Sequence, residues 1–406
     1  MVSVLAISAV LCVASISIYE PIVALYCVVA AFLLSVTQVG ASVSGLDPRY
    51  AAFPFALILL LVASSRQCNT WSRTRIVVRY IFLLGIIGVL TALKADLVHL
   101  SHLLGSIVAL IVVAMTVWSA SRLFLPEIIT RTLLYTVGVP VLLSVPLALT
   151  GYGIIGVRGA GLFGNPNGLG LAAAMCIPLA LGTCHRRGMR ILLCGGFVTA
   201  VLISGSRAAL GMVALELLIW YFPAPLRKYR LRLGVVAFLA VTVEGILVGT
   251  STHIGSNSIT GPLQHLVSGG ASRLTNWRLG IRLIQEHLIW GLGPNVDTLD
   301  IASSYLTVIA EAGVIGVIVA VRGLIIVIAI ARRAPPMVQA LVVAAAFDAI
   351  FEQWLFVGGS AYFLMFWLVL GTARDTCRGG TAVSPIRHAR PASSAETPKE
   401  SGFEPG

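Results

Sequence analysis

The chain has 406 residues, of which 58% are hydrophobic and only 11% are charged. An average soluble domain has about 25% charged residues. This composition therefore excludes a water-soluble enzyme, a nucleic-acid-binding module and a disordered regulator. The net charge of +12 would suggest a nucleic-acid partner in a soluble protein, but here we expect membrane topology to account for it.

Apolar segments follow one another along most of the chain. A helix needs about 20 apolar residues to cross about 30 Å of hydrocarbon, so these segments predict an all-α, polytopic transmembrane bundle. The expected number of spans is 12 or 13, because the first two segments are short and meet at Glu20 and Pro21. The expected spans are 2–18, 21–38, 50–65, 78–93, 101–119, 132–150, 168–183, 190–205, 207–222, 232–251, 303–331, 337–357 and 359–373.

The basic residues predict the orientation of this bundle. Of the 28 Lys and Arg residues, 20 fall in the C-terminal tail or in loops of the same side. Cytoplasmic loops carry an excess of Lys and Arg, so we assign that side to the cytoplasm. The chain then divides into an N-terminal transmembrane bundle (1–251), a large external loop (252–302), C-terminal transmembrane helices (303–373) and a disordered cytoplasmic tail (374–406).

The N-terminus and the cysteines bear on cleavage, disulfides and metal binding. The N-terminus has no basic residues before the first apolar segment, so we expect that segment to be retained and not cleaved. None of the seven cysteines lies in the external loop, which argues against a disulfide framework, and their spacing does not fit a metal site.

The first candidate site is the external segment 157–170, with the sequence VRGAGLFGNPNGLG. Asn165 before Pro166 favours an extended residue followed by a helix start. A helix N-terminus with a nearby arginine, here Arg158, can bind a phosphate. Asn165 and Asn167 are candidate binding residues with Arg158. An ordinary capped helix with glycines for close packing is the alternative.

The second candidate is the turn SGSR, residues 204–207. Ser206 is a suitable N-cap and places Arg207 at the start of the next helix. An arginine there opposes the helix dipole, which indicates an anionic partner. A bound pyrophosphate and a lipid headgroup are both compatible with this pattern.

The third candidate is the loop segment 272–295, which predicts an amphipathic helix within the external loop. Such a helix suits the membrane–water interface. Arg273, one turn before Trp277, lies at its first turn and is a candidate binding residue. The alternative is a helix that only anchors the loop to the surface.

Several ionisable residues fall in or near spans, where a charge needs a partner or a wet cavity. Glu311 and Glu352 lie towards the external ends of their helices. A substrate site would open at these ends, although structural pairing is the preferred interpretation for most of the ionisable groups in the spans.

Taken in order, these motifs resemble the O-antigen ligase and polymerase family of bacterial membrane glycosyltransferases. The resemblance covers roughly residues 150–371. It rests on Arg158 with GNPNG, on SGSRAAL, on SRLTNW with GLGPN, on SSYLTVIAEAGVIG, and on FEQWLF with FLMFWLVLG.

The resemblance implies a metal-independent and cofactor-free transfer at the external face of the bacterial cytoplasmic membrane. The donor would be a glycan on a polyprenyl diphosphate. The acceptor would be a lipid, a protein or another lipid-linked glycan, with no nucleic acid involved. Arg207 and Arg273, with Arg158 as a third, would bind the diphosphate leaving group, as guanidinium groups can do without a metal.

One departure from the family is informative. Ligases of this family carry a histidine just before the Tyr-Leu run, and here residues 301–304 read IASS. Glu311 and Asp300 are therefore the candidate bases for deprotonating an acceptor. The missing histidine favours a polymerase-like or divergent enzyme over a ligase, and a protein without catalysis is a further alternative.

Two other membrane functions are weighed against this one. A peptidoglycan glycosyltransferase of the shape-elongation-division-sporulation family is also all-helical with a large external loop. A transporter or flippase of lipid-linked glycans is expected to line its cavity with basic residues through both halves. The spans before residue 150 hold almost no charge, which argues against the flippase.

Overall fold

The computed structural model describes residues 13, 16–17, 19–37, 48–65, 72–92, 97–156, 158–221, 270–293, 301, 303–355 and 360–373. The expected spans 2–18 and 232–251 fall wholly or largely outside these residues, as do most of the external loop and the whole C-terminal tail. The number of spans and the division into domains therefore stay predictions.

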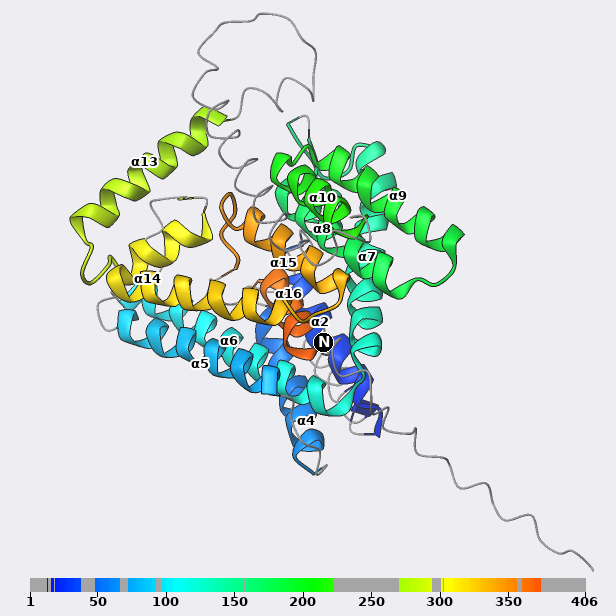
Figure 1. Cartoon of the computed structure of the whole chain (residues 1–406), viewed down its shortest axis with the longest axis horizontal. Coiled ribbons are helices and arrows are strands. Elements are labelled where there is room, and N and C mark those ends of the chain that lie inside the picture. Colours follow the sequence, from blue (N-terminus) through cyan, green and yellow to red (C-terminus); the bar gives the residue numbers. More distant parts are fainter. Residues whose placement is uncertain are drawn as a thin grey trace, which may run out of the picture.

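The described chain is an all-α bundle of apolar helices, as predicted (Figure 1). The helices are α2 (Pro21–Leu34), α4 (Ala52–Ser65), α5 (Ser72–Ala92), α6 (Leu97–Leu123), α7 (Pro126–Leu149), α8 (Pro166–Thr183), α9 (Arg187–Ser204), α10 (Arg207–Trp220), α13 (Gly270–Glu286), α14 (Ser304–Ala331), α15 (Pro336–Asp348) and α16 (Ala361–Thr372). A short 3-10 helix, η1 (Pro48–Ala51), precedes α4, and a two-stranded hairpin, β1 (Ile154–Ile155) with β2 (Arg158–Gly159), follows α7.

Five of the described helices are long and apolar enough to cross a membrane, which makes this a multi-pass membrane protein. Large apolar side chains such as Leu61, Leu143, Ile191, Leu192 and Ile325 are more than half exposed on the outside of the bundle. Patches of this kind are rare on soluble monomers and are expected where a protein faces lipid. The five helices are α7, α8, α9, α14 and the Gly105–Leu123 part of α6.

The helices start where the sequence provides a cap or a proline. Proline stands at the first position of α7, α8 and α15, where its missing N–H costs nothing. At four helix starts, including that of α8, a side-chain oxygen accepts a backbone N–H. This cap satisfies a donor that the helix itself cannot pair. These caps are Asn165 on α8, Ser206 on α10, Ser303 on α14 and Ser360 on α16.

The core is densest around α8. This helix packs against α7, α9, α10 and α15, and nearly every side chain from Leu169 to Leu181 is buried. In Figure 1 these helices gather on one side, while α5 and α6 run side by side with α14 along the other. Small residues in α8, such as the Ala172–Ala174 run, let its neighbours approach closely.

Two expected spans differ from the structure. Within α14 the backbone of Gly313 has φ 60° and ψ −137°, so two shorter helices meet there at a kink. The expected span 337–357 is a helix only to Asp348, and the chain then turns through 349–355. Both segments are apolar, so hydrophobicity alone gave no sign of the breaks.

Antiparallel packing gives the bundle two chemically different ends. One end holds the starts of α8, α10 and α16, together with the segment after α15. The other end holds the starts of α7 and α15 and the ends of α8, α10 and α16. With a rise of about 1.5 Å per residue, the 18-residue helix α8 separates these ends by about 27 Å.

Candidate functional site

Arg158 lies at the centre of a polar network at the first of these ends. It is the first residue of β2, and its side chain is partly buried. Its Nε donates a hydrogen bond to the carbonyl oxygen of Ser204 at 2.7 Å, and its Nη2 donates to Oδ1 of Asn167. The arginine therefore joins the β hairpin to the SGSR turn and to the start of α8.

Asn165 and Asn167 have different tasks at the start of α8. Asn165 is extended, and its Oδ1 accepts the backbone N–H of Asn167 at 2.9 Å, which caps the helix. Asn167 instead bridges two charged groups: its Oδ1 accepts from Arg158, and its Nδ2 donates to Oε1 of Glu352 at 2.8 Å. Asn165 shapes the backbone, and Asn167 belongs to the network.

The SGSR turn places a second helix start beside the first. Gly205 has a φ of 57°, a conformation that glycine adopts without steric cost, and it ends α9. Ser206 then caps α10 by accepting the N–H of Ala209 at 3.4 Å. A Cβ added to Gly170 on α8 would lie 2.6–2.8 Å from Ser204 and Ser206, so the two helix starts touch. Arg207, the first residue of α10, is exposed there.

Glu352 lies in the segment that follows α15 and is partly buried. Ser304, at the start of α14, holds this segment in place. Its Oγ donates to the carbonyl oxygen of Glu352 at 2.6 Å and accepts the N–H groups of Trp354 and Leu355 at 2.9 and 3.0 Å. The indole N–H of Trp354 in turn donates to Oδ2 of Asp348 at 2.7 Å. The backbone of the 352–355 segment is therefore fixed by several hydrogen bonds, and Asn167 binds the Glu352 carboxylate.

The amphipathic helix is confirmed as α13, and it reaches the same segment. The ring of Trp277 lies 5.7 Å from the ring of Phe351, which is next to Glu352. Arg273 is in the first turns of α13, one helical turn before Trp277, but its side chain lies outside the described part of the structure. The external orientation of α13 stays a prediction.

The structure describes one of the two candidate bases. Asp300 falls outside the described residues. Glu311 is partly buried on α14, two residues before the kink, and its backbone carbonyl accepts the N–H of Gly293 at 3.0 Å. A Cβ added to Gly291 would lie 2.2 Å from that carbonyl oxygen, so Gly291 packs tightly against the backbone near the kink.

The structure thus brings together Arg158, Asn167 and the turn that carries Arg207. Three contributors were missed or undervalued in the sequence: Glu352, Ser304 and Tyr362, whose hydroxyl donates to the carbonyl oxygen of Gly168 at 2.9 Å. Glu352 and Ser304 fall in the FEQWLF and SSYL motifs of the resemblance, but no local pattern indicates which groups their side chains bind.

Among the described residues, no cluster of three or more His, Cys, Asp or Glu side chains could hold a metal ion. At this end the described residues supply guanidinium groups, amides, the carboxylates of Glu352 and Asp348, and two adjacent helix starts. Such a set suits an anionic group that carries several oxygens. No protein-family model matches the chain, and no curated protein is significantly similar to it in sequence.

Proposed function

We propose that the protein is a membrane glycosyltransferase of the O-antigen ligase or polymerase type. It takes a glycan from a polyprenyl diphosphate and transfers it to a lipid-linked or surface acceptor. The site faces outwards across the bacterial cytoplasmic membrane, and the C-terminus is cytoplasmic.

One observation carries the proposal: the separate motifs of the resemblance meet around Glu352 and its neighbours. Asn167 of the GNPNG motif binds the Glu352 carboxylate across 185 residues of sequence. Arg158 and SGSR join through the Ser204 carbonyl, and Ser304 of the SSYL motif binds the Glu352 backbone. Trp277 of SRLTNW packs on Phe351. Motifs that served only local folding would not need to converge.

The geometry suits a diphosphate leaving group. The starts of α8 and α10 present positive dipole ends side by side, and each carries an arginine close by. In the transfer, the acceptor oxygen forms a bond to the anomeric carbon while the bond from that carbon to the diphosphate oxygen breaks. The electron pair leaves with the diphosphate, and the acceptor proton passes to a base, for which Glu311 and Asp300 are the candidates. Arg207, Arg273 and Arg158 would stabilise the charge that develops on the diphosphate.

The test is deletion of the gene, followed by size profiles of surface glycans and of lipid-linked glycans. The deletion strain is complemented with the wild type or with Arg207→Ala/Arg273→Ala. Accumulation of single repeat units in place of long chains, restored only by the wild type, identifies a polymerase. Long chains that remain on the carrier lipid identify a ligase.

Arg186→Ala/Arg187→Ala is the matched control, because it removes two exposed arginines from the opposite end of the bundle. We expect this control to complement fully at equal expression. Full complementation by Arg207→Ala/Arg273→Ala would refute the diphosphate-binding site and with it the proposed transfer.

A flippase for lipid-linked glycans is the second candidate, and the kink in α14 is the observation that favours it. Interrupted helices form the substrate sites of many transporters. In liposomes that contain the purified protein, a flippase moves the lipid-linked donor between leaflets without changing its glycan. A glycosyltransferase changes the glycan whether or not the lipid crosses.

A further inference from the structure

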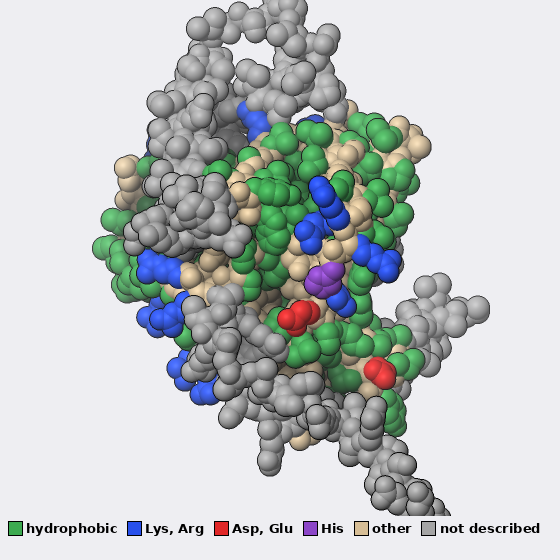
Figure 2. Space-filling model, turned by 45° about the vertical axis from the view of Figure 1, so that its right-hand side comes forward, with side chains coloured by type: hydrophobic (Ala, Val, Ile, Leu, Met, Phe, Trp, Pro, Cys, Tyr) green, Lys and Arg blue, Asp and Glu red, His purple; other side chains and the backbone are tan. Residues whose placement is uncertain are grey.

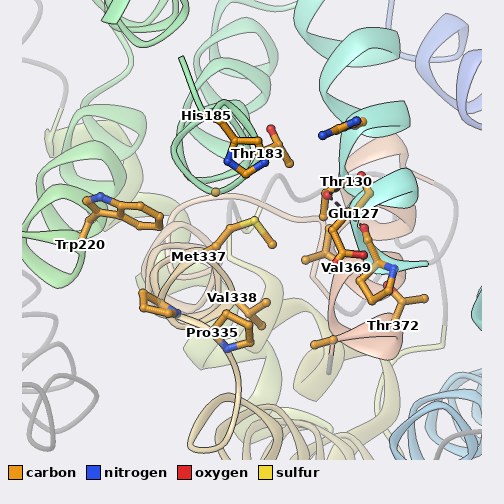
Figure 3. Close-up of a pocket in the computed structure, with 15 residues that line it drawn as sticks. Glu127, Thr130, Thr183, His185, Trp220, Pro335, Met337, Val338, Val369 and Thr372 are labelled. Atoms are coloured by element: carbon orange, nitrogen blue, oxygen red, sulfur yellow. Dashed lines mark hydrogen bonds between the residues drawn. The ribbon is translucent and has the colours of Figure 1, made fainter. Parts of the chain in front are cut away.

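A pocket of about 260 Å³ opens at the far end of the bundle from the proposed active site. Five helix ends surround it: the starts of α7 and α15, and the ends of α8, α10 and α16. In Figure 3, His185 and Met337 lie on one wall, and Thr130 and Glu127 lie on the facing wall. The volume is below the roughly 300–1,000 Å³ of pockets for drug-sized ligands, and it suits a small polar head.

The pocket has an apolar part and a basic part. The apolar part of the lining consists of Met337, Val338, Val369 and the ring of Trp220. The basic side chains in the lining are Arg131 and His185, both exposed, and neither has an ion-pair or hydrogen-bond partner in the part of the chain that the structure describes.

More basic residues flank the opening. Figure 2 shows Lys or Arg side chains gathered around a histidine and an acidic residue on one face of the molecule. The segment that follows His185 supplies exposed charges close to the lining, and the turn between α14 and α15 supplies two more. These residues are Arg186, Arg187, Arg332 and Arg333.

The groups that oppose an anion here are few or already occupied. Glu127 is the acidic residue in the lining, and as part of the first turn of α7 it complements that helix dipole. The carbonyl of Cys184, the residue directly after α8, accepts two hydrogen bonds from Arg190, at 2.9 and 2.7 Å. The carbonyl of Ala334 accepts one from Gln339 at 3.1 Å. The starts of α7 and α15 have no side-chain cap.

We propose that this pocket binds the phosphate-bearing headgroup of an anionic phospholipid. The phosphate pairs with Arg131 and His185, and the glycerol and upper acyl chain lie against Met337 and Trp220. Basic pockets between helices at the cytoplasmic face are a recognised way to hold anionic lipids. The proposal is independent of the proposed glycosyl transfer, because the two sites lie at opposite ends of α8.

The test is native mass spectrometry of the full-length protein, purified in detergent and titrated with phosphatidylglycerol or phosphatidylcholine. We expect the wild type to bind one phosphatidylglycerol at least about tenfold more tightly than phosphatidylcholine. Arg131→Gln/His185→Gln should reduce this binding about tenfold or more, because charge-assisted hydrogen bonds to phosphate are lost and each 1.4 kcal/mol is tenfold. Thr183→Trp fills the pocket without changing charge and should have the same effect.

Arg186→Gln/Arg187→Gln is the matched control, since it removes two nearby charges that do not line the pocket. It should leave the tight site intact. If the two double variants lose phosphatidylglycerol binding equally, the lipid is held by general electrostatic attraction and the site is overturned. A wild type without preference for phosphatidylglycerol over phosphatidylcholine would also overturn the site. Binding of glycerol 3-phosphate at least as tight as that of the lipid would overturn the lipid assignment in favour of a soluble phosphate. Thermal melting shows which variants are folded. If Arg131→Gln/His185→Gln is not folded, lipid binding by Thr183→Trp tests the pocket instead.

Discussion

Asn167 makes hydrogen bonds to two groups of opposite charge, the Arg158 guanidinium and the Glu352 carboxylate. Its amide offers an acceptor to Arg158 and a donor to Glu352, a combination that aspartate cannot provide. Asn167→Asp would set a second carboxylate against Glu352 and lose the donor. We expect a loss of about 1–3 kcal/mol in the free energy of unfolding and a clear loss of activity, measured by thermal melting and glycan profiling.

A second substitution tests whether that loss acts through Glu352. In Asn167→Asp/Glu352→Gln the new amide can donate to the new carboxylate, so part of the stability should return. Because the two residues share a hydrogen bond, their effects should not be additive. Simple addition of the two single losses would contradict the bridging role of Asn167.

Glu216 presents the opposite case, a buried carboxylate that no described residue binds. It is fully buried on α10, and neither carboxylate oxygen has a hydrogen-bond partner among the residues that the structure describes. An unsatisfied buried polar group costs about 1–3 kcal/mol, so Glu216→Leu should raise the melting temperature. Glu352→Leu is the control: it removes a carboxylate that does have a partner and should lower the melting temperature. A lower melting temperature for Glu216→Leu would show that this carboxylate is needed where it lies.

At the scale of elements, the start of α14 determines where Glu352 lies. Ser304 makes three hydrogen bonds through its hydroxyl group to the 352–355 segment, whereas Ser303 makes one long cap bond of 3.5 Å to Leu306. Ser304→Ala leaves buried backbone groups unpaired, so we expect at least about 1–3 kcal/mol of destabilisation. Ser303→Ala should cost less. Melting curves of the two adjacent variants compare these losses directly, and equal losses would contradict the special position of Ser304.

Much of the helical architecture follows from the sequence, because a span is set by its own length and apolarity. The helix starts at Pro166 and Arg207 can also be predicted from local sequence, because the capping residues Asn165 and Ser206 directly precede them. The kink at Gly313 was missed because it depends on contact with the 288–291 segment, which a local reading of α14 cannot supply.

The candidate site was predictable only in part, for the same reason. Arg158 and Asn167 stood out because polar residues are scarce in this chain. Their pairing with each other is short-range in sequence, but the bond from Asn167 to Glu352 spans 185 residues. No local pattern indicates such a partner, so the sequence places Glu352 only near the external end of a span and does not link it to Asn167.

For the molecule as a whole, charge is divided between the two ends of the bundle. Seven of the arginines that the sequence assigns to one side flank helices at the pocket end. They are Arg122, Arg131, Arg186, Arg187, Arg190, Arg332 and Arg333. Arg158 and Arg207 lie at the other end. Because excess Lys and Arg marks the cytoplasmic side, the pocket should face inwards and the Arg158 network outwards.

Cysteine labelling in intact cells tests this orientation. In a background without the seven native cysteines, Tyr152→Cys reports on the hairpin end and Gly188→Cys on the pocket end. Both positions are exposed, and a Cβ at Gly188 meets nothing within 4 Å. A membrane-impermeant maleimide should label Tyr152→Cys in intact cells and Gly188→Cys only after permeabilisation. The reverse pattern would place the Arg158 network in the cytoplasm, where it would meet carrier-linked glycans before export. A transfer at the external face would then be excluded even if the same arginines bound a diphosphate.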